Sequence, residues 1–304
     1  MDDQQTKWHM ELEGMPHFDK AMERVYAWYE QEIIDRVPVR FFAHNSQFNV
    51  DSGVKRTPEE QRELWFDVEY QVENYLKSIE GQRFYGETFP IFSPNLGPDV
   101  YAAFYGAELE FGDVTSWSHP FVKTWDDVEK LHFSRDNVYF KKLEELTQHA
   151  LERCAGKFLV GYTDFHPGED CAMAWRGSTQ LCMDVYDHPE ELHNLITFAF
   201  KDFQEIFDHF DDMIKAAGQP SSTWIGLPSF GKMHVPSCDW SAMISPKFFN
   251  KFSLPYLREE VKTMDHNIYH VDGPGVARHL DQILSVPEVH AIQWVQGLGT
   301  LAPI

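Results

Sequence analysis

Residues 266–275, HNIYHVDGPG, join a short apolar strand to two ionisable side chains and a turn. The apolar run ends at His270, and Asp272 follows two positions later. Residues two apart in a strand point to the same side of a sheet, so the imidazole and the carboxylate should share one surface. The sequence GPG at 273–275 lets the backbone turn away without covering them. We therefore interpret the end of this strand as the edge of a polar site.

Apolar strands alternate with helical segments along the rest of the chain. Such strands, rich in Val, Ile, Phe and Tyr, are typical of a parallel sheet covered on both faces. An open doubly wound sheet and a (β/α)₈ barrel both fit this alternation. Neither G-x-G-x-x-G nor a P-loop is present, so we expect no nucleotide cofactor. The strands are expected in 35–45, 87–95, 157–170, 222–240, 267–273 and 289–297, and the main helices in 16–34, 57–79, 124–131, 137–156, 188–218, 245–264 and 275–286.

Polar side chains gather where each of these strands ends, and this favours the barrel. Barrel enzymes carry their active sites at the carboxyl ends of the strands. We predict one TIM-barrel domain over 1–304, with a helical lead-in over 1–35 and the barrel beginning at residue 36. The polar groups at the strand ends are His44 and Asn45, Ser93 and Asn95, Asp164 and His166, His234 and Asp239, His270 and Asp272, and Gln293.

Charge and composition exclude several classes of function. The formal net charge of −22 repels phosphate backbones, so nucleic-acid binding is not expected. The chain has no apolar run of about 18 residues, which excludes a membrane span of the usual kind. The acidic N-terminus does not resemble a signal peptide, and the four cysteines form no CxxC pair. These features predict a cytoplasmic protein.

Three segments resemble the uroporphyrinogen decarboxylase superfamily. Residues 238–261, CDWSAMISPKFFNKFSLPYLREEV, are followed by IYHVDGPG at 268–275. The family has an Asp with small residues, then ISP, a Phe-containing helix reaching Pro-Tyr, and a strand that ends in a His near a Gly. Residues 33–41, IIDRVPVRF, match the family's segment before the first strand. The resemblance runs over most of the chain, is specific only in these blocks, and implies a (β/α)₈ barrel.

That superfamily contains two chemistries. Its decarboxylases open with an arginine-bearing segment that grips the substrate's carboxylates, where this chain has RFFAHNSQF at 40–48 and only Arg40. With the negative charge, this disfavours decarboxylation of an octa-carboxylate. The other branch exchanges methyl groups with corrinoid proteins or thiols and uses zinc held by an H-x-C pair and a distant cysteine. By the resemblance, His270 and Asp272 occupy the H-x-C position, with a carboxylate replacing the thiolate.

The candidate metal ligands are His270 and Asp272, joined by His234 and Cys238 on HVPSC. His and Asp are good zinc ligands, and a cysteine favours zinc over magnesium. Asp239 matches the carboxylate of the family block and is a candidate catalytic residue together with His270 and Asp272. The alternatives are structural: a buried His–Asp pair, a loop histidine beside a small buried cysteine, and a helix N-cap at Asp239.

Other polar and aromatic residues are candidates for binding a small-molecule substrate. Arg176 either receives a substrate carboxylate or pairs with an acid of its own loop, and we favour the ion pair slightly. In that loop, Glu169 and Asp170 are interpreted as solvated acids. The substrate-binding candidates are His44, Asn45, Asp164, His166, Arg176, Trp240 and Gln293.

Three functions remain open from the sequence. The first is a methyltransferase, metal-assisted, with a corrinoid protein as methyl donor or acceptor. The second is a metal-free decarboxylase of a smaller acid, in which Asp239 or Asp272 stabilises a protonated intermediate and His270 is the general acid. The third is a non-catalytic barrel that binds a ligand. The pattern yields six strands where the family has eight, so we expect a truncated barrel whose open edges favour a homodimer.

Overall fold

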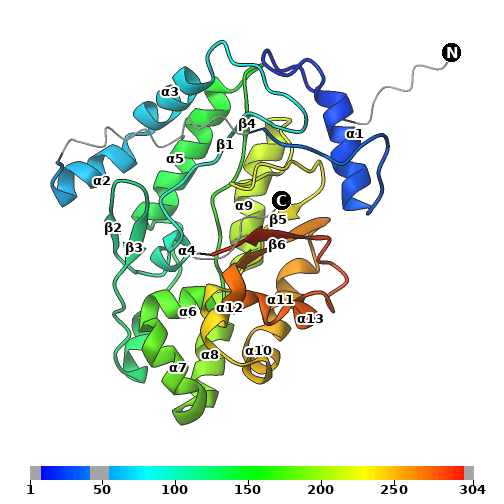
Figure 1. Ribbon diagram of the computed structural model, residues 1–304. Coiled ribbons are helices and arrows are strands. Elements are labelled where there is room, and N and C mark those ends of the chain that lie inside the picture. The colour runs from blue at the N-terminus through cyan, green and yellow to red at the C-terminus, as the bar shows by residue number, and fades with distance from the viewer. Residues whose placement is uncertain (1–7, 42–54, 298–304) are drawn as a thin grey trace.

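The computed structural model describes residues 8–41 and 55–297 and shows a mixed α/β architecture (Figure 1). Within these ranges, no helix has both the length and the apolar character that crossing a membrane requires. The helices are α1 (Phe18–Tyr29), α2 (Pro58–Phe66), α3 (Val68–Ile79), α4 (Val100–Ala103), α5 (Val138–Arg153), α6 (Glu169–Arg176), α7 (Ser178–Asp187), α8 (Pro189–Phe200), α9 (Phe203–Ala216), α10 (Pro246–Phe252), α11 (Leu254–Val261), α12 (Gly273–Ala277) and α13 (Leu280–Ile283), with 3₁₀ helices η1 (Trp125–Lys130) and η2 (Asp239–Met243). The strands are β1 (Ile91–Phe92), β2 (Leu109–Phe111), β3 (Ser116–Ser118), β4 (Leu159–Val160), β5 (Met233–His234), β6 (His266–Asp272) and β7 (Ala291–Val295).

The parallel strands lie in two groups joined by a short extended segment. β1 pairs with β4, and β5, β6 and β7 pair in that order. Between the groups, the Tyr162 backbone N–H donates to the Ser222 carbonyl at 2.9 Å. The Met233 backbone N–H donates to the Ser221 hydroxyl at 3.1 Å. Among the described residues the two groups are separate sheets, and no closed sheet is present.

Local capping explains why one expected helix is two. The sequence predicts a helix over 57–79, and its start is confirmed by a capping box between Thr57 and Glu60. The helix breaks at Asp67, whose side chain accepts the Tyr70 backbone N–H at 2.9 Å and so begins α3. An aspartate that caps a new helix withdraws its own backbone from the preceding one. The expected helix over 188–218 is also divided, into α8 and α9, but without a side-chain cap at Asp202.

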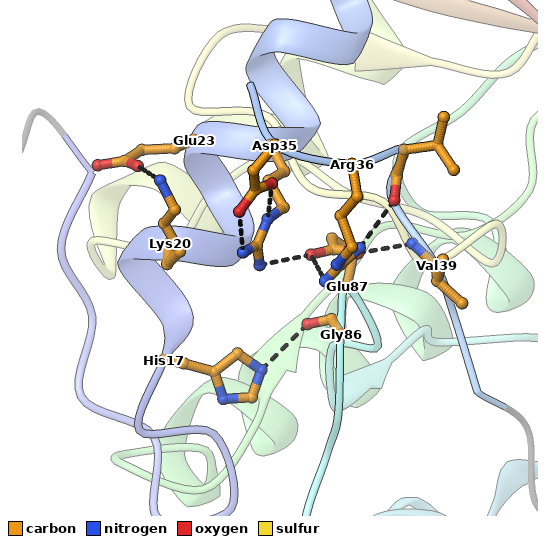
Figure 2. Close-up of polar contacts among 10 residues, drawn as sticks. His17, Lys20, Glu23, Asp35, Arg36, Val39, Gly86 and Glu87 are labelled. Atoms are coloured by element: carbon orange, nitrogen blue, oxygen red, sulfur yellow. Dashed lines mark hydrogen bonds and ion pairs between the residues drawn. The ribbon is translucent and has the colours of Figure 1, made fainter. Parts of the chain in front are cut away.

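The expected first strand does not form in the described residues. Arg40 pairs with Gly86 only as an isolated antiparallel bridge, and residues 42–45 lie outside the described ranges. Ion pairs hold the preceding segment instead, because the buried Glu87 carboxylate accepts from Arg24 and Arg36 (Figure 2). The antiparallel β2–β3 hairpin was not expected from the sequence.

Apolar side chains pack on both sides of β6. The largest cluster joins Tyr269 and Val271 of β6 to helices α4 to α11, and includes Trp175 and Trp240. A second cluster packs α1 against the strands through residues such as Met233 and Ile268. Burial of β6 on both faces therefore confirms the parallel-sheet reading of its continuous apolar run.

His266, the first residue of β6, makes stability depend on pH. Its ring stacks on Tyr29 at a centroid distance of 3.9 Å, and Nδ1 lies 2.8 Å from the Ser229 hydroxyl. Burial, helped by the neighbouring His290, lowers the pKa of His266 from 6.5 to about 4. Between these values the unfolded chain binds the proton and the folded chain does not, so stability falls as the pH decreases.

We expect the titration of His266 to lower the free energy of unfolding by about 2 kcal/mol when the pH falls from 7.5 to 5. Urea unfolding of the wild type and His266→Asn at both pH values measures the difference, because the asparagine cannot titrate. Equal pH dependence in the two proteins would contradict the assignment.

Candidate metal centre

Three side chains from two neighbouring strand ends converge on one point. Asp239 begins η2 after β5, and His270 and Asp272 end β6. Each offers one ligand atom, and the three atoms lie within 4.8 Å of one another. The two aspartates are exposed and His270 is half-buried, so a solute can reach the cluster from solvent. The two-residue spacing of His270 and Asp272 places them on one side of β6, as their positions in the sequence predict.

The orientation of the His270 ring is fixed by the neighbouring strand. His270 pairs with Gln293 in the β6–β7 register, and its Nδ1 donates to the Gln293 side-chain oxygen. The Trp224 ring packs edge-on against the imidazole at a centroid distance of 5.3 Å. This arrangement leaves Nε2 of His270 as the ligand atom, and a ligating histidine commonly donates its other N–H in this way.

Negative charge accumulates at the cluster. Asp239 is exposed as a residue, but its carboxylate lies among other protein groups and near Asp170 and Asp272. Burial and the like charge of Asp170 raise the pKa of Asp239 to about 6, although His166 and His270 oppose the change. Carboxylates whose ionisation is opposed by other carboxylates are stabilised by a nearby cation. The electrostatics therefore favour binding of a positively charged ligand.

A second ionisable pair lies beside the cluster, after β4. Nε2 of His166 is 2.8 Å from a carboxylate oxygen of Asp164, and its Nδ1 is 2.6 Å from the Ser237 hydroxyl. Burial lowers the pKa of His166, but the nearby Asp164 outweighs it and holds that pKa well above its usual value. The ring is thus a buried positive charge close to Asp239.

His234 and Cys238 are not brought to the three-residue cluster. His234 pairs with Asn267 in the β5–β6 register, three positions before His270, and its Nε2 lies 2.7 Å from Glu260. The thiol of Cys238 faces Glu169 at 3.8 Å, and burial raises its pKa well above the usual value. Neither residue is among the described side chains whose ligand atoms converge, although the sequence predicts both as metal ligands.

The remaining candidates are placed elsewhere in the fold. Arg176 is buried and bonds to Asp184, not to the acids of its own loop, and its guanidinium lies 4.0 Å from the Trp125 ring centroid. Trp240 is fully buried and donates to the sulfur of Cys182 at 3.3 Å. His44 and Asn45 lie outside the described residues.

The interpretation of Glu169 and Asp170 as solvated acids is wrong. Residues 169–176 form α6, and both carboxyl groups are buried. Burial raises the pKa of Glu169 to about 8, with Ser253 opposing. Asp170 accepts backbone hydrogen bonds from η2. No local sequence signal distinguishes this pair from surface acids, because their burial depends on the packing of α6 against η2.

Comparisons with known proteins give a likeness of fold. No protein-family model matches the sequence, and no curated protein matches it. Among solved structures, the chain is similar to a methyltransferase from Methanosarcina mazei, with a TM-score of 0.56 and 14% sequence identity. The match covers 90% of this chain and 75% of that one. The likeness supports a methyltransferase-like fold.

Proposed function

We propose that this chain is a methyltransferase with a barrel of the uroporphyrinogen decarboxylase type, acting with a corrinoid protein as methyl donor or acceptor. The observation that carries the proposal is the convergence of Asp239, His270 and Asp272 at the ends of β5 and β6. In barrels of this class, this end of the strands is where chemistry takes place. The likeness in fold to a methyltransferase supports the reaction class.

The donor set fits a divalent metal. One imidazole and two carboxylates suit Zn²⁺ or Mn²⁺, and two carboxylates balance the charge of the ion. Asp239, His270 and Asp272 would hold it. When bound, the metal would supply Lewis acidity that activates the hydroxyl or thiol of the methyl acceptor. Carboxylate in place of thiolate makes the site harder, so we favour an alcohol as the acceptor over a thiol.

The surrounding side chains keep this site ordered. Gln293 fixes the tautomer of His270, so that Nε2 carries the lone pair. Asp164 and Ser237 hold His166, and its positive charge limits the repulsion between Asp239 and Asp170. Trp224 supplies an apolar wall, 39% exposed, beside the imidazole. A small acceptor could therefore lie against Trp224 with its polar atom toward the three ligands.

We expect about one divalent metal ion per chain in protein expressed in metal-replete medium, measured by mass spectrometry. Methyl transfer from methylcobalamin to small alcohols, followed by the cobalamin absorbance, should be lost on chelation and restored by the metal. The thiol 2-mercaptoethanol serves as the comparison acceptor. Wild-type protein without metal would contradict metal-assisted transfer, and small carboxylated acids would then be tested for decarboxylation.

A further inference from the structure

Asp170 is a buried carboxylate that bonds to the backbone beside the metal centre. Only 7% of the residue is exposed. One of its oxygens accepts the Asp239 backbone N–H at 2.9 Å, and the other accepts the Trp240 N–H at 3.0 Å. Both are among the first N–H groups of η2, which have no partner inside that helix. Asp170 therefore anchors the start of η2 to α6.

This anchor matters because Asp239 comes from a different element than its two companions. His270 and Asp272 share β6, so strand geometry alone sets their spacing. The segment that carries Asp239 is tied to β6 before η2 begins, where the His270 backbone N–H donates to the Pro236 carbonyl at 2.9 Å. Beyond Pro236, the side chains of Ser237 and Cys238 contact His166 and Glu169, and the two bonds that Asp170 accepts hold the backbone at Asp239 itself.

η2 is also held by α12, which follows β6, and by the residues directly after α12. A side-chain carbon added at Gly275 of α12 would lie 2.8 Å from the Ala242 side chain, so only a glycine permits this close approach. The imidazole of His279 lies 2.9 Å from the Ser241 carbonyl. The short helix η2 thus packs against both α6 and α12, with the exposed Asp239 at its start.

We propose that Asp170 is a positioning residue of the metal centre, which holds the Asp239 carboxylate in ligating distance of His270 and Asp272 by fixing the start of η2. This inference rests on the proposed function, because it assumes that the three side chains bind a metal. Asp170 also reaches the same imidazole as Ser237, since its carboxylate lies 3.7 Å from Nδ1 of His166. The residue therefore connects the two ionisable groups of the site.

The test compares Asp170→Asn with Glu169→Gln. Asparagine keeps the shape of the side chain but offers one acceptor oxygen, so its amide N–H₂ meets a backbone N–H, donor against donor. Glu169 is the adjacent buried acid of α6, and the atoms near it belong to Cys238 and Ser253. Glutamine there resembles the neutral acid, because burial raises the pKa of Glu169 to about 8.

Binding of Co²⁺ at pH 7.5 is measured by calorimetry and by the visible absorption of the bound ion. We expect Asp170→Asn to weaken binding about 10- to 100-fold, as loss of a group that orients a ligand commonly does. Its Co²⁺ spectrum should shift toward that of Asp239→Asn, a change that general destabilisation does not produce. Glu169→Gln should bind within about twofold of the wild type.

An unchanged affinity and spectrum in Asp170→Asn, with wild-type binding intact, would overturn the positioning role alone. A wild type that binds no Co²⁺ would instead overturn the proposed function. If Asp170→Asn does not fold, Gly275→Ala displaces η2 from its other side and should weaken Co²⁺ binding without touching a ligand. Wild-type affinity in a folded Gly275→Ala protein would then overturn the role of η2 placement.

Discussion

His270→Ala is expected to weaken zinc binding by roughly a hundredfold or more and to abolish metal-dependent methyl transfer. Structural zinc held by four side chains gains roughly 10–16 kcal/mol, or about 3 kcal/mol per ligand. Loss of about 3 kcal/mol corresponds to roughly a hundredfold in affinity. His270 contributes the sole nitrogen of the three-residue cluster, and the two aspartates alone form a weaker zinc site. Competition with a chromophoric chelator measures the affinity.

Two further variants distinguish ligation from a general effect of losing a side chain. Gln293→Leu removes the acceptor that orients the imidazole, and we expect a smaller loss, about tenfold. His132→Ala removes an exposed histidine that bonds only to a nearby backbone carbonyl, and its affinity should equal that of the wild type. Wild-type zinc affinity in folded His270→Ala protein would rule out His270 as a ligand.

The part of the site on β6 could be predicted from the sequence because it depends on local rules. An apolar run ending in His-x-Asp predicts the strand, and the two-residue period places His270 and Asp272 on one side. Asp239 is expected near this edge because it follows another predicted strand and matches the carboxylate of the family block, which predicts a catalytic role for it and not a metal ligand. These three residues are the ones that the structure brings together.

The rest of the site depends on pairings that no local pattern contains. His234 and Cys238 also lie at the end of a strand, but the β5–β6 register places His234 three positions below His270. Asp170 has the appearance of a surface acid until α6 packs against η2 and encloses it. The sequence explains Gly275 as part of a turn. The structure shows that its missing side chain also lets Ala242 of η2 pack closely against α12.

The strand expected at 35–45 forms only an isolated bridge at Arg40 within its described residues, 35–41, for a comparable reason. Its alternating apolar residues predict a strand, yet Val37 and Val39 are exposed at 55% and 37%. The charged residues of the same segment find buried partners instead. Arg36 donates to both oxygens of Glu87 at 2.7 and 2.8 Å, and Glu87 also accepts the Val39 backbone N–H. A charge pair between distant residues thus determines the path of the backbone, and single-sequence patterns do not show it.

Glu87 lies at the centre of this arrangement, and its loss should reduce stability strongly (Figure 2). Its side chain is fully buried and accepts from Arg24 at 3.2 Å as well as from Arg36. Burial alone would raise the pKa of Glu87, but these hydrogen bonds outweigh it and hold the pKa below its usual value. The carboxylate is therefore ionised at neutral pH, with its lone pairs satisfied from α1 and from the segment after it.

Glu87→Ala should lower the free energy of unfolding by about 3 kcal/mol, because removal of one partner leaves buried charge and a backbone N–H without an acceptor. The loss lies near the lower end for buried pairs, since Arg24 keeps its bond to Asp35 and Arg36 is 38% exposed. Lys20→Ala breaks the exposed Lys20–Glu23 pair on α1, the helix that also carries Arg24, and should cost less than about 1 kcal/mol. Urea unfolding at pH 7.5 measures both. A Glu87→Ala loss no larger than that of Lys20→Ala would show that the segment after α1 is held by its apolar contacts and not by this carboxylate.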